Sequence, residues 1–249
     1  MLRSRIIPVL LIQNKGLVKT CNFKNPVYLG DPINAIKIFN EKEVDELIIL
    51  DIEASKNGKG INWNMISRLN QEAFMPLGYG GGIKNIQDIK KIIKLGYEKV
   101  ILNSAALENP DLLKEASEII GSQSLVVCVD IKKNINGSFK VYSHQNHKIT
   151  NLDPVAYIKT LEANGTGEVV VQSVDREGTY SGYEISVLKE ISGQIKIPVI
   201  ALGGASGLAD IKAILKTDIS AAAAGSIFVF FGRLKAVLIS YPSSEEIEK

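Results

Sequence analysis

The sequence predicts an α/β fold in which strands and helices alternate and close into a barrel. Short runs rich in Val, Ile and Leu are followed by amphipathic helical segments along the whole chain, which is typical of a parallel sheet covered by helices. Eight such units close most naturally into a ring. The two halves of the chain also resemble each other, which disfavours an open doubly wound sheet with the same alternation. We therefore expect one domain over residues 1–249, a (β/α)8 TIM barrel with two-fold half-barrel pseudo-symmetry.

Each element follows from its residues. Strands are expected where four to eight apolar residues stand between turn residues, and helices where apolar residues recur every three or four positions. The expected strands are Ile6–Ile12, Glu46–Ile52, Leu77–Gly80, Lys99–Leu102, Leu125–Ile131, Glu168–Val171, Val199–Leu202 and Ser220–Gly225. The expected helices are Asp31–Asn40, Trp63–Gln71, Ile86–Leu95, Pro110–Ile120, Pro154–Ala163, Glu184–Ile191, Leu208–Lys216 and, more weakly, Leu234–Ile239.

One segment departs from this alternation. Lys132–Lys148 is polar and contains an Asn-Gly turn after the fifth strand, so we expect a β-hairpin inserted in the loop. The segment holds both histidines of the chain, His144 and His147. An exposed polar loop and a ligand-contacting role are both compatible with this placement.

An internal repeat supports the barrel. The segment that begins PLGYGGGIKN aligns without a gap on the segment that begins PVIALGGASG, so that Gly81 matches Gly203, 122 positions later. Glu46 and Glu168 have the same spacing. A chain about twice this long, built from two similar halves, is a two-fold pseudo-symmetric barrel.

The charge balance, the apolar runs and the cysteine count of the sequence argue against several classes of function. The formal charge is +2, from 29 Lys and Arg against 27 Asp and Glu, which does not indicate a nucleic-acid surface. No signal peptide and no run of 18 or more apolar residues is found, so we expect a cytoplasmic protein without membrane contact. Cys21 and Cys128 are expected to be isolated thiols. We expect neither a cofactor nor a metal.

Two glycine-rich turns lie where a barrel carries its functional loops, at the carboxyl ends of the strands. They are Gly80–Gly82 and Gly203–Gly204, and each is followed one unit later by a helix start, LNSA and AGSI. Glycine lets the backbone approach an anion closely, and free N–H groups at a helix start attract one. One such arrangement per half predicts a ligand with a phosphate at each end, stretched across the barrel mouth. Duplicated turn chemistry without a ligand is the alternative.

Several motifs together resemble one known family. They are NFKNPVYLGDP, DELIILDI, GGGI, NSAALENP, GSQ before the fifth strand, VDIK, DREGTYSGY and GGA, and they cover nearly the whole chain. The chain resembles the cyclase subunit of imidazole glycerol phosphate synthase (HisF), a lyase of histidine biosynthesis that takes ammonia from a glutaminase partner. The resemblance implies a pocket for a ribonucleotide with two phosphates. The residues it places near the phosphates are Gly82, Asn103, Ser104, Gly178, Thr179, Gly203, Gly204, Gly225 and Ser226.

The resemblance also implies a ring of charges at the opposite end of the barrel, where the strands begin, ammonia enters and the glutaminase (HisH-like) docks. The matching residues are Arg5, Glu46, Lys99 and Glu168. A structural salt-bridge layer is the alternative, because residues at this end of a barrel usually serve stability. We favour a gate, since charges that converge on an axis are costly to desolvate unless they are paired.

Leu11 stands where a catalytic acid is expected. The resemblance implies two aspartates at the ends of strands one and five, one to give a proton and one to accept it. Asp130 fills the second place, and the internal repeat puts Leu11 opposite it when Arg5–Ile12 is laid on Ser124–Ile131. A leucine cannot exchange protons, so whether the chain has cyclase activity of its own stays open. Lys19 could supply a compensating charge near Asp130.

Leu202, Glu177 and Val229 also depart from the residues usual in the family. With Leu11 they resemble a divergent branch, the glycosyl amidation-associated (WbuZ-type) proteins encoded with surface-polysaccharide genes. This resemblance implies a subunit that receives ammonia from a glutaminase and works with a separate sugar amidotransferase, which converts an acetamido group on a sugar to an acetamidino group. The alternatives are a genuine imidazole glycerol phosphate synthase subunit and a structural or phosphate-sensing partner.

Overall fold

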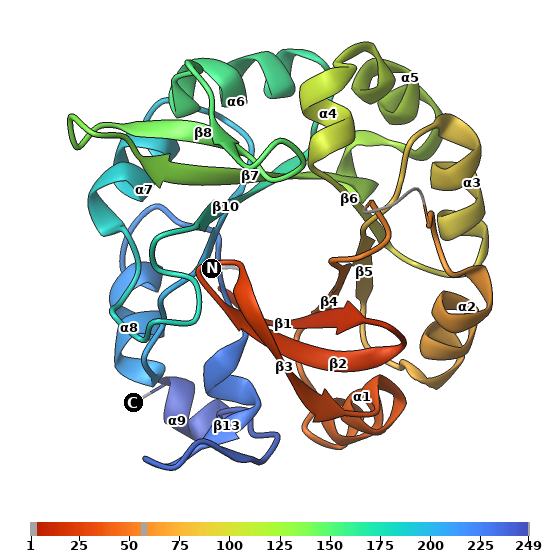
Figure 1. Cartoon of the computed structure of the whole chain (residues 1–249), viewed down its shortest axis with the longest axis vertical. Helices are drawn as coiled ribbons and strands as arrows, with labels where there is room; N and C mark the ends of the chain where they lie inside the picture. The colour runs from red at the N-terminus through yellow and green to blue at the C-terminus, as the bar shows by residue number, and fades with distance from the viewer. Residues whose placement is uncertain (1–3, 56–58, 249) are drawn as a thin grey trace.

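The protein is a closed ring of eight parallel strands in a computed structural model that describes residues 4–55 and 59–248 (Figure 1). In order around the ring, the strands are β1 (Arg5–Gln13), β4 (Leu47–Asp51), β5 (Leu77–Gly80), β6 (Lys99–Leu102), β7 (Leu125–Lys133), β10 (Glu168–Ser173), β11 (Val199–Leu202) and β12 (Ala221–Ala224). Pairing of β12 with β1 closes the ring. The predicted (β/α)8 barrel is confirmed.

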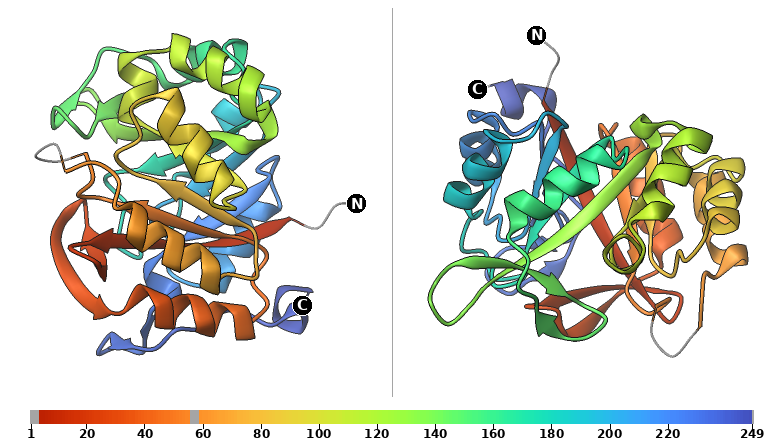
Figure 2. Two further views of the ribbon diagram at one scale, coloured as in Figure 1. Left: turned by 90° about the vertical axis from the view of Figure 1, so that its right-hand side faces the viewer. Right: turned by 90° about the horizontal axis from the view of Figure 1, so that it is seen from above.

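Helices form a layer outside the ring (Figures 1 and 2). They are α1 (Pro32–Glu41), α2 (Trp63–Glu72), α3 (Ile86–Lys94), α4 (Ser104–Glu108), α5 (Asp111–Ile120), α6 (Pro154–Ala163), α7 (Ile185–Ser192), α8 (Leu208–Leu215) and α9 (Ser244–Glu248), with 3-10 turns at Ser122–Ser124 (η2) and Ser226–Phe228 (η3). Side-chain caps fix several helix starts, as where Asp31 Oδ1 accepts a hydrogen bond from the N–H of Ile33. The apolar faces of the helices bury residues such as Phe39 and Ile158 against the strands. No helix in the described ranges is long and apolar enough to cross a membrane.

A second, smaller apolar core fills the inside of the ring. Its residues are Ile7, Val9, Leu11, Val18, Ile48, Ile101, Val126, Cys128, Val170, Ile200, Leu202, Ala221 and Ala223. Strand residues alternate between the two faces of a sheet, so every second residue points inward and packs there. The interior of this barrel is therefore lined mainly by aliphatic side chains.

The register of the strand pairs repeats between the two halves. The equivalent pairs are Leu11–Leu50 and Asp130–Gln172, Leu50–Gly80 and Gln172–Leu202, Gly80–Ile101 and Leu202–Ala223, and Leu102–Val127 and Ala224–Pro8. Two residues that pair with equivalent partners in the two halves occupy equivalent positions in the barrel wall. Leu11 is thus the structural counterpart of Asp130, and Leu202 is the counterpart of Gly80.

Two hairpins project from the carboxyl ends of the barrel strands, at the end opposite α9 (Figure 2). The first is formed by β2 (Gly16–Cys21) and β3 (Lys24–Gly30), which continue from β1, and the second by β8 (Phe139–Ser143) and β9 (Lys148–Ile149), which continue from β7. The second lies within the predicted hairpin segment except for Ile149, and β7 pairs antiparallel with β8 there. The first was not predicted, because Asn14 and Lys15 adopt positive φ angles of 48° and 67° without a glycine to indicate the turn.

The helix expected at Leu234–Ile239 is wrong. A short hairpin of β13 (Phe230–Phe231) and β14 (Ala236–Val237) occupies this part of the chain. Gly232 and Lys235 take φ angles of 70° and 51°, and the N–H of Lys235 donates to the carbonyl of Gly232 at 3.1 Å. This tight turn reverses the chain where a helix would continue it.

Candidate functional site

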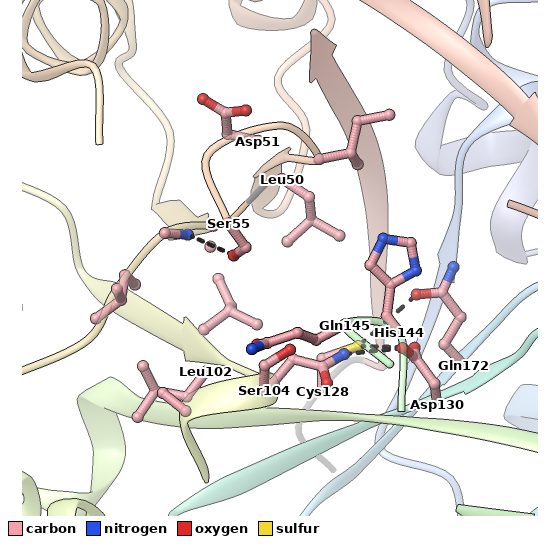
Figure 3. Close-up of a pocket in the computed structure, with 18 of the residues that line it drawn as sticks. Leu50, Asp51, Ser55, Leu102, Ser104, Cys128, Asp130, His144, Gln145 and Gln172 are labelled. Atoms are coloured by element: carbon pink, nitrogen blue, oxygen red, sulfur yellow. Dashed lines mark hydrogen bonds between the residues drawn. The ribbon is translucent and has the colours of Figure 1, made fainter. Parts of the chain in front are cut away.

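A cavity of about 540 Å³ lies at the carboxyl ends of the first-half strands, and we name it the first cavity (Figure 3). Aliphatic side chains line part of it, namely Leu11, Leu50, Ile52, Ile83, Ile101 and Leu102. Polar side chains line the rest, among them Asp51, Ser55, Asn103, Ser104, Asp130, His144, Gln145 and Gln172. A cavity of this size, with a few polar groups over an apolar base, suits a small organic ligand.

Asp130 is the buried acid of the first cavity. Its residue is 3% exposed, and burial raises the pKa of its carboxyl group to about 7. The amide of Asn103 donates to Asp130 Oδ2 at 2.9 Å, and the thiol of Cys128 donates to Oδ1 at 3.9 Å, and these bonds partly offset the rise. Gln172 Oε1, 3.7 Å from the same sulfur, is the alternative acceptor for its single proton. A carboxyl group with a pKa near neutrality can both give and accept a proton under physiological conditions.

Leu11 lines the same cavity, at the position that corresponds to Asp130 in the other half. It is 7% exposed and belongs to the inner apolar core. The wall of β1 therefore offers the ligand a methyl-bearing side chain where β7 offers a carboxyl group.

The two histidines lie next to each other but differ in exposure and in what they contact. His144, in the turn after β8, lines the first cavity, and its ring makes edge contacts with the rings of Phe23 and His147 at centroid distances of 5.4 and 5.5 Å. His147 is exposed. The exposed-loop interpretation holds for His147, whereas His144 brings a titratable group into the cavity of Asp130.

A second cavity, of about 40 Å³, lies at the corresponding place in the second half. It contains the side chain of Lys19, which is 5% exposed and donates to the carbonyl of Val9 at 2.6 Å. Burial lowers the pKa of Lys19 to about 8, and the charge of Glu177 in the same cavity opposes this fall. Lys19 thus faces the second cavity together with Glu177.

The residues expected near phosphates are divided between the two cavities. Gly82, Asn103 and Ser104 line the first. The second is lined by Gly178, Gly203, Gly204, Gly225 and Ser226. Thr179 lines neither of these two cavities, and its hydroxyl donates to the carbonyl of Arg176 at 2.7 Å. The structure groups these residues in two cavities. Phosphate binding at them stays a prediction.

The four charged residues expected at the other end of the barrel meet in a closed ring. Arg5 bridges Glu46, at 2.5 Å, and Glu168. Lys99 Nζ bridges the same two carboxylates, at 2.9 Å from Glu46 and 2.6 Å from Glu168. Positive and negative groups alternate, so each buried glutamate contacts two cations. Their role as a gate stays a prediction.

The structure adds residues that the sequence did not single out. Gln172 lines both cavities, and Cys128 joins it to Asp130. Gln172 is the counterpart of Leu50, so the repeat alone could have pointed to it. No cluster of three or more His, Cys, Asp or Glu side chains that could hold a metal ion occurs within residues 4–55 and 59–248.

Comparison with known proteins agrees with this architecture. The histidine biosynthesis protein family matches residues 5–235. A Vibrio vulnificus (strain YJ016) protein named "Putative imidazole glycerol phosphate synthase subunit hisF3" is 46% identical over 251 residues, covering 100% of this chain and 96% of that protein. A Pseudomonas aeruginosa (strain PAO1) protein with the corresponding name ending in hisF2 is 45% identical over 249 residues, covering 100% and 99%. The Petrotoga mobilis "Imidazole glycerol phosphate synthase subunit HisF" is 40% identical over 229 residues, covering 92% and 91%. The chain belongs to the histidine biosynthesis protein family, as a HisF-like barrel.

Proposed function

We propose that the chain is a non-cyclising barrel subunit of a glutamine-dependent amidation system. It receives ammonia from a glutaminase at the end where the strands begin. The acceptor is a sugar of surface polysaccharide, on which a separate sugar amidotransferase converts an acetamido group to an acetamidino group. The observation that carries the proposal is Leu11, which replaces the counterpart of Asp130 while the charged ring is intact.

The loss at Leu11 bears on the chemistry of the cavity. Cyclisation with two proton transfers needs an acid and a base on opposite sides of the ligand. The position on β1 supplies neither, and Gln13, two residues later, has an amide that does not titrate near neutral pH. Loss of one member of an acid and base pair costs on the order of 10²–10⁴-fold in rate. This supports a barrel whose remaining task is to conduct and present ammonia.

An axial route for ammonia is compatible with the barrel interior. The charged ring of Arg5, Glu46, Lys99 and Glu168 lies at one end, the first cavity lies at the other, and the aliphatic inner core lies between them. Neutral ammonia enters apolar surroundings at far lower cost than ammonium, because an uncompensated charge is strongly penalised there. The ring is electrically neutral, so a partner that docks on it does not bury a net charge.

The family supports the choice of partner. HisF subunits work with a glutaminase, HisH, in the synthase complex, and two relatives that match 100% of this chain are named as putative subunits of that synthase. The glutaminase is therefore the expected partner, and the strand-beginning end, with the ring, is the expected contact face.

The proposal is tested by mixing the protein with a glutaminase from the same organism and measuring glutamine hydrolysis. The barrel should stimulate hydrolysis by at least about tenfold when the sugar nucleotide that it serves is present. Arg5→Lys, which keeps the charge of the ring but not its forked geometry, should reduce the stimulation. Arg68→Lys, at an exposed position on α2, is the matched control and should leave it unchanged. Inertness with every glutaminase and sugar nucleotide tried would count against the proposal.

A second candidate is a genuine cyclase subunit, favoured by the pKa of about 7 at Asp130, which suits acid and base catalysis. Rescue of a histidine-requiring strain by this gene, lost on Asp130→Asn, would establish it and overturn the first proposal. If the wild-type chain does not rescue and Leu11→Asp does, the first cavity is otherwise competent and Leu11 alone accounts for the lost activity.

A further inference from the structure

The two cavities differ in size although the strands around them repeat. The first holds about 540 Å³ and the second about 40 Å³, which is room for only a few water molecules. Leu11 and Gln172 line both, so the cavities meet on the two sides of these residues. A symmetric ligand site should have two similar ends, and this one does not.

The two cavities differ at one pair of equivalent positions in the barrel wall, Gly80 and Leu202. Gly80 lies opposite Ile101 in the first half, and its counterpart Leu202 lies opposite Ala223 in the second. A Cβ atom on Gly80 would come within 2.9 Å of the carbonyl oxygen of Ile101, so the first-half wall has no room for a side chain there. In the second half, Leu202 occupies this position, is 7% exposed and lines the second cavity. The glycine end is open and the leucine end is filled.

Charge reinforces the difference. The Cβ of Gly82 would lie 2.7 Å from that of Ala54, and the Cβ of Gly204 would lie 2.9 Å from that of Arg176, so the loops that follow the two strands also correspond. The residue after Ala54 is Ser55, whose neutral hydroxyl accepts the N–H of Gly82 at 3.3 Å.

The residue after Arg176 is Glu177, which is 7% exposed and lines the second cavity. Its carboxylate accepts from Thr20 Oγ1 at 2.8 Å and from the N–H of Phe23 at 2.9 Å. The ammonium group of Lys19 in the same cavity donates to the carbonyl of Val9 at 2.6 Å, and the nearby carboxylate of Glu177 would repel a phosphate placed beside it.

We propose that this barrel takes a sugar-sized, polyhydroxylated ligand with a single phosphate, held at Gly82, Asn103 and Ser104, and that the second cradle of the fold does not bind a phosphate. The amide and carboxyl groups of the first cavity, among them Gln172 and Asp130, are suited to bind sugar hydroxyls. The uncharged end of the ligand lies toward Leu11. This inference deepens the proposed function and rests on it, since it names the class of molecule that meets the ammonia.

The test compares matched probes on the purified chain by calorimetry. Inorganic phosphate should bind with one site per chain. Fructose 6-phosphate and fructose 1,6-bisphosphate differ by one phosphate, and they should bind with affinities within about threefold of each other. Two phosphate sites per wild-type chain, tenfold tighter binding of the bisphosphate, or no binding of any probe would overturn the inference.

The internal repeat supplies matched variants. Ser104→Asp places a carboxylate in the first cavity and should weaken fructose 6-phosphate binding more than tenfold, whereas Ser226→Asp, at the equivalent place in the second half, should change it less than threefold. Leu202→Gly combined with Glu177→Ser copies Gly80 and Ser55 of the first half and should open a second phosphate site. Equal weakening by both aspartates would contradict the inference, and melting temperatures would show that each variant is folded. These measurements need no glutaminase, so their failure is distinguishable from failure of the proposed function.

Discussion

The buried carboxyl group of Asp130 should make the stability of the protein depend on pH. Its pKa rises from an ordinary value of 3.8 to about 7, because burial disfavours the charged form. A difference of about three pH units, at 1.36 kcal/mol each, corresponds to about 4 kcal/mol. The folded-state pKa lies above the unfolded one, so the protein loses this stability as the pH rises from about 4 to about 7, and the full cost applies above that range.

Asp130→Asn should remove this cost. The asparagine can still accept the hydrogen bond of Asn103, but it loses the acceptor of the Cys128 thiol, for a penalty of about 1 kcal/mol. We expect a net gain of about 3 kcal/mol at pH 8.5, which raises the melting temperature by roughly 6–12 °C for a chain of this size. At pH 4.5 the cost in the wild-type protein is only about 1 kcal/mol, so the two effects cancel.

Differential scanning calorimetry of both proteins at the two pH values measures the difference. Asp31→Asn, at an exposed helix cap, controls for the loss of a negative charge and should shift the melting temperature little at either pH. An Asp130→Asn shift that is the same at pH 4.5 and pH 8.5 would refute the reasoning, because it would mean that Asp130 is charged at low cost in the folded protein.

Three further outcomes follow. Arg5→Ala leaves the buried Glu46 and Glu168 with one cation instead of two. It should lower the free energy of unfolding in urea by about 2–3 kcal/mol, a figure discounted for the partial exposure of Arg5. An unchanged unfolding midpoint would show that the charged ring does not stabilise the fold. His144→Gln should weaken binding of fructose 6-phosphate several-fold because His144 lines the cavity of Asp130, while His147→Gln in the same hairpin should leave it within twofold. Gly82 has a φ of 70°, and a Cβ added to it would lie 2.7 Å from the Cβ of Ala54, so Gly82→Ala should lower the free energy of unfolding by about 2–3 kcal/mol. Gly137 has a similar φ but open space around it, and Gly137→Ala should lower the free energy of unfolding by only about 1 kcal/mol. Equal losses in the two variants would show that the contact with Ala54 is relieved.

Much of the barrel could be predicted because its strands are buried on both faces. A run such as Leu125–Val129 is apolar throughout, and this pattern is visible without a structure. The elements that were not predicted depend on positive φ angles at residues other than glycine, which the residue types do not indicate. Asn14-Lys15 turns β1 into β2 with two positive φ angles, and Lys235 takes another in the hairpin near the end of the chain. Tertiary packing selects these turns, so local sequence predicts them poorly.

The site could be predicted in part for a related reason. The repeat identifies Leu11 as the counterpart of Asp130 because strand register is periodic, and a constant offset in sequence becomes a constant offset in space. The unequal cavities could not be predicted, because the size of a cavity depends on how side chains such as Leu202 pack across neighbouring strands. The placement of His144 depends on how a whole hairpin folds over the barrel mouth, which no local pattern encodes.

The charged ring shows that the two halves of the chain are no longer interchangeable. Glu168 is the single contribution of the second half to the ring, and the counterparts of Arg5 and Lys99 there are Ser124 and Ala221. A chimeric barrel made from two copies of the second half would bury two glutamates without a cation, and one made from two copies of the first would gather four cations around two glutamates. Only the mixed pairing is electroneutral, so a gene-duplication ancestor with identical halves must have balanced this end of the barrel with other residues.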